Sequence, residues 1–180
     1  MKTSTKTSDA RLAKMFAAEA RKCFERYLPR IVGCLRQLDE TEIWWRPNPS
    51  SNSAGNLVLH LCGNIRQWIL SGLGGAPDVR VRDMEFSERG PIPRRVLVAQ
   101  LRKTVGQVCA VLDGLSGDDL LREHTIQGFH ETGLSAVAHV FEHFSHHAGQ
   151  IIYLTKLKRG KDLRFTRLPK VKSRKPPAKK

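Results

Sequence analysis

Four of the seven histidines in this chain, His139, His143, His146 and His147, stand within the short segment AHVFEHFSHHAGQ. On a helix, residues four apart lie one turn apart on the same face, so His143 and His147 can direct two imidazoles toward one ion. Both also lie in the apolar seam of the predicted helix. Two imidazoles in a helical core cost desolvation free energy unless a partner satisfies their nitrogens, and a metal ion suits this spacing best.

His60 offers a third nitrogen from a different predicted helix, where its neighbours Leu57 and Leu61 are apolar. Three nitrogen ligands with one open position are typical of a catalytic zinc-like site, whereas structural zinc sites are closed by four protein ligands. The sequence therefore predicts that His60, His143 and His147 bind a divalent metal, zinc first and nickel or iron as alternatives. The competing interpretation leaves the helix-spaced pair at the core edge, hydrogen-bonded to carbonyl groups or to each other.

Two polar residues neighbour the histidine pair. Glu142 and Gln150 are candidates for orienting a ligand imidazole, or for moving a proton to and from a bound water. Glu142 is equally consistent with an exposed helix carboxylate. His139 and His146 share a neighbouring face, and we expect His146 beside the site or in a contact between two copies.

A further group of polar and aromatic residues could contact a substrate or cofactor. These weaker candidates are Asn64, Arg66, Trp68, Arg82, Asp83 and Glu85. In the alternative interpretation, Trp68 belongs to the core, and the two acids form a salt-bridged loop with Arg82.

Four long helices are expected to position these residues, because apolar residues recur at helical spacing over residues 9–38, 54–71, 93–115 and 132–158. Pro29 is expected to kink or split the first helix, and Asn52 or Ser53 to cap the second. Pro93 suits the first turn of the third helix. We expect a polar connection at 76–93 and a short extended segment, strand or loop, at 124–129.

The composition excludes several classes of protein. With 40% hydrophobic and 27% charged residues, the 180-residue chain can bury a sizeable core, unlike a disordered polymer, a collagen or a disulfide mini-protein. The four cysteines lack CxxC spacing, so we expect small core residues in a reducing compartment. There is no Rossmann or P-loop glycine pattern, no apolar run long enough to cross a membrane and no apolar stretch of a secretory signal. We therefore expect a cytoplasmic protein without a membrane contact.

The positive charge is concentrated at the C-terminal end. Residues 156–180 hold 12 basic residues against one acid, a net of +11 of the total +14, which leaves +3 for residues 1–155. We expect a disordered basic tail over residues 166–180, because its Lys, Pro and Ser residues have little to bury. Such a tail can make weak nonspecific contacts with nucleic acid, or it can simply keep the protein in solution.

Two segments, NLVLHLCGNIRQWI and HVFEHFSHHAGQIIYLTK, resemble the DinB/YfiT-like superfamily of metal-binding four-helix bundles. The resemblance extends over about residues 9–165 and implies that His60, His143 and His147 are the ligands. Gly149 and Gln150 match the residues that follow the histidine pair. The loops WWRPNPSSNSAGN, RDMEF and GPIPR look like those of an uncharacterised subgroup. Characterised relatives include metal-dependent transferases and isomerases that activate a low-molecular-weight thiol such as mycothiol or bacillithiol, and family members often dimerise.

These observations together predict an all-α protein, a four-helix bundle of DinB/YfiT type with short irregular insertions. The bundle domain is expected at 9–165, after a flexible segment at 1–8 and before the disordered tail at 166–180. The expected function is that of a metal-dependent enzyme, S-transferase-like or hydrolase-like, that activates a thiol or water toward a small-molecule substrate and forms a homodimer. The alternative is a non-enzymatic scaffold whose basic tail contacts nucleic acid or an acidic partner.

Overall fold

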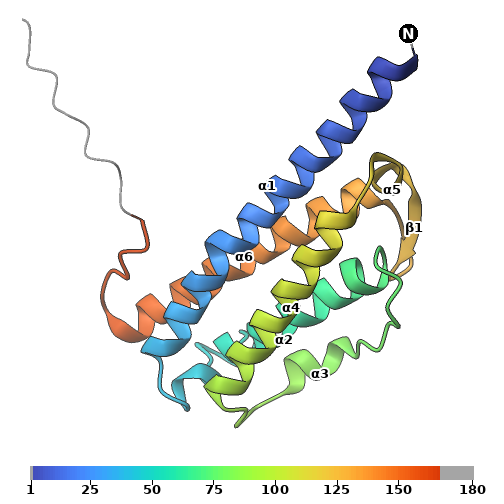
Figure 1. Cartoon of the computed structure of the whole chain (residues 1–180). Coiled ribbons are helices and arrows are strands. Elements are labelled where there is room, and N and C mark those ends of the chain that lie inside the picture. The colour runs from blue at the N-terminus through green and yellow to red at the C-terminus, as the bar shows by residue number, and fades with distance from the viewer. Residues whose placement is uncertain (1, 167–180) are drawn as a thin grey trace, which may run out of the picture.

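Four long helices pack against one another in the computed structural model, which describes residues 2–166 (Figure 1). They are α1 (Lys2–Gln37), α2 (Ala54–Ile65), α4 (Arg94–Gly114) and α6 (Gly133–Arg159). This arrangement confirms the predicted all-α helical bundle. Over the described part of the chain, no helix combines the length and the hydropathy that crossing a membrane requires.

Short elements connect the long helices. The second predicted helix is in fact two elements, because the π-helix η2 (Arg66–Ser71) continues directly from α2. The others, in chain order, are η1 (Glu42–Trp44), α3 (Arg82–Ser87), α5 (Gly117–Leu121), β1 (Glu123–Ile126) and β2 (Phe129–Thr132).

Two of these connections differ from the expectation. The segment 76–93, expected as a polar connection, contains the helix α3, which is too short to leave a helical period in the sequence. The extended segment expected at 124–129 is part of a two-stranded antiparallel hairpin formed by β1 and β2, with Ile126 paired to Phe129. The chain reverses at Gln127 and Gly128, which both have positive φ.

Helix termini follow the chemistry of their capping residues. Of the two predicted caps for α2, the structure uses Ser53, whose hydroxyl accepts a hydrogen bond from the Asn56 amide at 3.1 Å. Thr132 caps α6 in the same way through the Ser135 amide. At the other end of α6, Gly160 takes the left-handed conformation that closes a helix. These caps fix where the two histidine-bearing helices begin and end.

Helix α1 is longer and more regular than expected. It begins at Lys2 and not near Asp9, and the stretch before Asp9 contains no glycine or proline that would stop a helix. That residues 1–8 are flexible stays a prediction. Pro29 does not split the helix. Both Pro29 and Glu25, whose carbonyl loses its usual amide donor, are exposed, and solvent can satisfy that carbonyl.

The core lies between the four long helices. The rings of Phe24 on α1 and Phe144 on α6 meet edge to face, with centroids 5.0 Å apart. Two of the four cysteines, Cys34 and Cys62, are buried as predicted, and all four are free thiols. Burial raises the pKa of Cys34 to about 11 and that of Cys62 to about 12, so both remain protonated.

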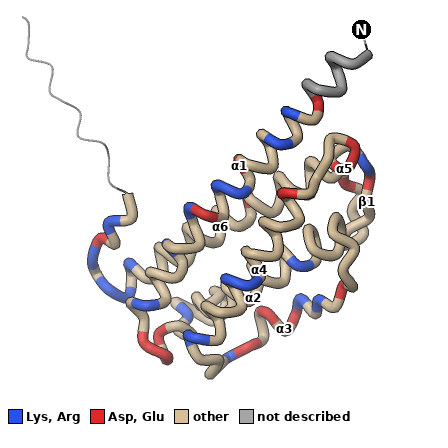
Figure 2. Tube along the Cα trace, in the orientation of Figure 1, with Lys and Arg blue, Asp and Glu red and all other residues tan. Residues whose placement is uncertain are grey.

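Basic residues gather at the C-terminal end of α6 and in the segment that follows it (Figure 2). Lys156, Lys158 and Arg159 stand in the last turn of α6, where positive charge complements the helix dipole. Lys158 also lies over the ring of Trp45, 4.7 Å from its centroid. The predicted tail at 166–180 lies, apart from Thr166, outside the described residues.

Trp44 fixes the start of α2 through a close contact with Gly55. A Cβ on Gly55 would lie 2.9 Å from atoms of the indole ring. We therefore expect Gly55→Ala to lower the free energy of unfolding by about 1–3 kcal/mol, because the ring must move. Gly106→Ala on the exposed face of α4, where a Cβ meets nothing within 4 Å, should instead raise it by about 0.5–1 kcal/mol. Urea denaturation followed by circular dichroism measures both, and equal stability of the two variants would contradict this packing.

Candidate metal centre

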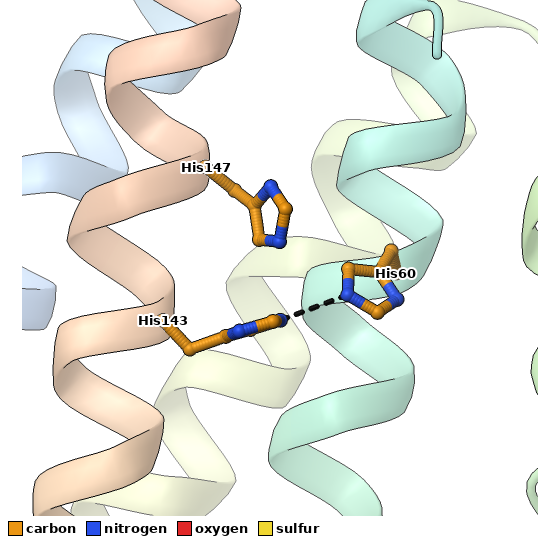
Figure 3. Close-up of side chains that lie close together, drawn as sticks. All are labelled: His60, His143 and His147. Carbon is orange, nitrogen blue, oxygen red and sulfur yellow. Dashed lines mark hydrogen bonds between the residues drawn. The ribbon is translucent and has the colours of Figure 1, made fainter. Parts of the chain in front are cut away.

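The three predicted histidines meet between α2 and α6. Figure 3 shows the rings of His143 and His147 turned from α6 toward His60 on α2. The Nε2 atoms of His60 and His143 are 2.8 Å apart, and one potential ligand atom from each of the three residues lies within 4.8 Å of the others. His60 is buried, whereas His143 and His147 are half-buried. This three-histidine cluster is compatible with a divalent metal ion.

Helical periodicity accounts for the convergence. The apolar members of the seam predicted for α6, Ala136, Val140, Ile151 and Leu154, are all buried. The two histidines between them are thereby held against α2. On α2, Leu57, Leu61 and Asn64 are buried like His60, and the imidazole of His60 meets the ring of His143 on α6 with centroids 4.8 Å apart.

A buried ion pair contacts His60 from behind, that is, at Nδ1, whereas its Nε2 faces His143 on α6. The Nδ1 atom of His60 lies 2.8 Å from Oε2 of Glu85, and Arg80 donates from Nε and Nη2 to the two oxygens of the same carboxylate at 2.8 and 2.9 Å. Burial alone would raise the pKa of Glu85, but the hydrogen bonds from Arg80 and His60 outweigh it and lower the pKa. The ionised carboxylate can only accept, so His60 carries its proton on Nδ1 and presents the lone pair of Nε2 to the cluster.

Gly63 makes room for this ion pair. A Cβ on Gly63 would overlap Oε1 of Glu85 and lie 2.9 Å from Nε of Arg80. The carboxylate therefore rests directly on α2, three residues after His60. Arg80 is further held by the side-chain oxygen of Gln67 on η2, which accepts from Nη1 at 2.9 Å.

His147 has its own hydrogen-bond partner. Its Nδ1 lies 2.7 Å from Oε1 of Gln150, and the Gln150 amide nitrogen lies 3.2 Å from Nε2 of His146. Because the amide oxygen only accepts, Nδ1 of His147 donates and its Nε2 is left with a lone pair. The structure thus places Gln150 within hydrogen-bond distance of one histidine of the cluster.

The cluster favours neutral imidazoles. Burial, together with the neighbouring His147 and His60, lowers the pKa of His143 to about 3. Burial also lowers the pKa of His147 to about 4, although its hydrogen bond to Gln150 opposes the shift. At neutral pH both side chains are therefore unprotonated bases, the form that a metal ion requires.

His139 extends the row of histidines along α6 and meets two of the residues predicted as substrate contacts. Its ring lies against Trp68, with centroids 4.1 Å apart, and against His143 at 5.3 Å. The amide nitrogen of buried Asn64 lies 3.2 Å from Nε2 of His139. Trp68 is buried, in agreement with its interpretation as a core residue, and its indole N–H donates to Gln127 in the hairpin.

The remaining candidates lie around the cluster and are not hydrogen-bonded to it in the described structure. Glu142 is exposed and lines, with three histidines including His143, a cavity of about 220 Å³. Arg66 is exposed beside a separate cavity of about 370 Å³. The guanidinium of exposed Arg82 lies 4.9 Å from the ring centroid of Phe86, and that ring lies 4.7 Å from His60. The salt bridges expected between Arg82 and the two acids Asp83 and Glu85 are not found in the described part of the chain, because Glu85 pairs with Arg80 and His60 instead.

Sequence reasoning missed the contributions of Arg80, Gly63 and Phe86, and it placed Glu85 among the substrate contacts. The ion pair spans α3 and the segment before it, and its partners are 5 to 25 residues apart without a common period. One signal was present in the sequence. Gly63 interrupts a strongly apolar helical stretch, and a glycine inside a helix often marks the close approach of another group.

Comparisons with known proteins agree with this fold. A DinB-like protein from Bacillus cereus ATCC 10987 superimposes with a TM-score of 0.57 at 18% identity, covering 76% of this chain and 89% of that one. A DinB-like protein from Bacillus subtilis superimposes with a TM-score of 0.59 at 19% identity, covering 84% and 96%. The bundle therefore has the DinB-like fold that the sequence predicted. A comparison with curated proteins found no match. The family described as "Protein of unknown function (DUF1572)" matches residues 11–172, and the chain belongs to this family.

Proposed function

We propose that this protein is a metal-dependent enzyme in which His60, His143 and His147 bind a divalent ion that activates a thiol or a water molecule. The observation that carries the proposal is the convergence of three imidazoles from two helices, with potential ligand atoms within 4.8 Å of one another. His60 and His147 each have their Nδ1 engaged by a partner, which leaves Nε2 for an ion. Such a donor set fits a metal better than it fits a packed core.

Three imidazole nitrogens suit zinc, and they also suit nickel or iron. When bound, such an ion lowers the pKa of a coordinated thiol or water and makes a nucleophile available near neutral pH. The chain itself orients the ligands: Glu85 and Arg80 hold His60, and Gln150 holds His147. The half-buried faces of His143 and His147 leave room for a substrate to approach.

The reaction class that we propose is S-transferase-like or hydrolase-like, with a low-molecular-weight thiol or water as the nucleophile and a small molecule as the electrophile. The reaction class follows from the resemblance of two segments of the sequence to the DinB/YfiT-like superfamily, and the DinB-like fold agrees with that resemblance. The scaffold alternative depends on the basic tail. It predicts salt-sensitive binding to nucleic acid or an acidic partner that is lost when residues 166–180 are deleted, whereas the enzyme proposal predicts that metal binding survives the deletion.

The first prediction concerns metal content. Elemental analysis of untagged protein by inductively coupled plasma mass spectrometry should find about one equivalent of zinc, nickel or iron per chain. His143→Ala and His147→Ala should each lose it, because two imidazoles hold a divalent ion poorly. His130→Ala, on the exposed strand β2, is the matched control and should keep the metal. A wild-type protein without metal, and without a thermal shift on adding any of the three, would refute the proposal.

The second prediction concerns the ion pair behind His60. Glu85→Gln and Gly63→Ala should each weaken metal binding about 10–100-fold, since both disturb the hydrogen bond that orients His60. Competition with a chromophoric chelator measures the affinity, and Gly106→Ala serves as the control for a glycine substitution in a helix. Affinities within about twofold of wild type would show that His60 does not depend on Glu85.

The third prediction concerns pH. In the metal-free folded protein His143 and His147 stay neutral down to a pKa of about 3 and 4, whereas in the unfolded chain they titrate near 6.5. Between these values the unfolded chain binds more protons, so this contribution to stability is complete above about pH 6.5 and is lost as the pH falls. Urea unfolding in the presence of a chelator should therefore show a steeper loss from pH 7 to pH 4.5 in wild type than in His143→Ala/His147→Ala. Parallel curves would show that burial does not perturb the two imidazoles.

A further inference from the structure

A cavity of about 540 Å³ adjoins the histidine cluster, between the loop before α2 and the exposed face of α6. We infer that this cavity binds the non-reacting part of the substrate, and that this part is uncharged, with an apolar or aromatic group beside neutral hydrogen-bonding groups. The inference rests on the proposed function, and it names the class of molecule on which the site acts. The volume lies in the range of cavities that bind small molecules.

Gln150 connects the cavity to the cluster. The Gln150 side chain lines the cavity, and its amide oxygen lies 2.7 Å from Nδ1 of His147. His146, which also lines the cavity, lies 3.2 Å from the amide nitrogen of Gln150. A molecule in this cavity would therefore touch the residue that orients one of the proposed ligands, and its reactive end would lie close to the cluster.

The walls of the cavity explain which molecules it suits. Although 27% of the residues in the chain are charged, the cavity lining contains no Lys, Arg, Asp or Glu. Pro47, Leu57 and the largely exposed ring of Tyr153 offer apolar contact, whereas Ser50 and Asn52 offer neutral donors and acceptors. An ionised group would find no countercharge from Lys, Arg, Asp or Glu in this cavity, so the lining favours uncharged molecules.

The other large cavity near the cluster has a different character. It has a volume of about 370 Å³, and its lining includes Arg66, Asp78 and the buried pair of Arg80 and Glu85. These side chains are already engaged with one another, with Gln67 or with His60, except for the exposed Arg66. The charged residues that line this cavity therefore serve the ion pair behind His60. The uncharged cavity is the better place for a substrate.

Gly149 is the position in the wall of the proposed binding cavity where a side chain can be added without a clash. It is exposed on α6, lines the cavity, and a Cβ built on it meets nothing within 4 Å. A side chain at this position therefore extends without a clash from a residue that forms part of the cavity wall. Because Gly149 has an ordinary helical conformation, a larger residue can be introduced there without backbone strain.

The experiment compares ligand binding to three metal-loaded full-length proteins: wild type, Gly149→Leu, and Gly106→Leu as the matched control on the exposed face of α4. The probes are phenyl β-glucoside and 2-phenylethanol, which are uncharged, and phenyl β-glucuronide and phenylethylammonium, which carry opposite charges. Saturation-transfer NMR detects binding in the millimolar range. We expect the uncharged probes to bind wild type and Gly106→Leu, to bind Gly149→Leu at least about tenfold more weakly, and to bind better than both charged analogues.

Proximity to the cluster is measured separately. Signals of a probe bound to cobalt(II)-loaded protein should be broadened more than with zinc-loaded protein, because unpaired electrons relax nearby protons. The inference is overturned if neither uncharged probe binds, if Gly149→Leu binds them as well as Gly106→Leu does, or if the charged analogues bind equally well. Metal content measured on the same samples keeps the two proposals apart. A protein without metal refutes the enzyme proposal, whereas metal retained without the expected probe binding refutes only the cavity assignment.

Discussion

The burial of His60 is the constraint on which the rest of the site depends. A buried imidazole needs a partner at each nitrogen, and here one nitrogen meets the Glu85 carboxylate while the other faces the histidines of α6. The carboxylate in turn is buried and requires Arg80, and both fit against α2 only because Gly63 lacks a side chain. The contacts of His60 with Glu85, and of Glu85 with Arg80, thus connect the cluster to the segment that carries α3. They explain why this segment packs against α2 although many of its residues are polar.

The same constraint explains why the two histidine-bearing helices contribute differently to the cluster. Helix α2 contributes a single buried ligand candidate that is held by a buried ion pair, and its start is fixed by Ser53 and by the packing of Trp44 on Gly55. Helix α6 contributes two half-buried candidates, one of which is held by Gln150 on the exposed face. One side of the cluster is therefore rigid and closed, and the other is open to solvent. This asymmetry is typical of a site that binds a second molecule.

How far the sequence predicted this structure depends on the range of the interactions. The four long helices follow from local periodicity, and the cap at Asn52 or Ser53 follows from the residue types before α2. The convergence of His60 with His143 and His147 was predicted from apolar faces that must pack together, and the structure agrees. The sequence shows no periodic pattern for the ion pair of Arg80 and Glu85 or for the short helix α3. Both are fixed by contacts with α2, which is distant in the sequence. The predicted start of α1, near residue 9, was wrong because the polar residues at 2–8 leave no apolar period in the sequence. None of them ends a helix, so the helix begins at Lys2.

Gln150 links the two proposals, because a single amide can serve both. Its oxygen accepts from His147 and its nitrogen lies near His146, so it has a fixed orientation at the border between the cluster and the uncharged cavity. A fixed neutral group at this border suits an enzyme that places an uncharged substrate beside a metal ion. Because the Gln150 amide is uncharged, it does not attract the anionic nucleophile away from the metal ion. The carboxylate that contacts the cluster directly lies instead behind His60, where Arg80 neutralises Glu85. On the open side, Glu142 lines a separate cavity with His143, whereas the cavity beside Gln150 is lined without Lys, Arg, Asp or Glu and is the neutral place for the substrate.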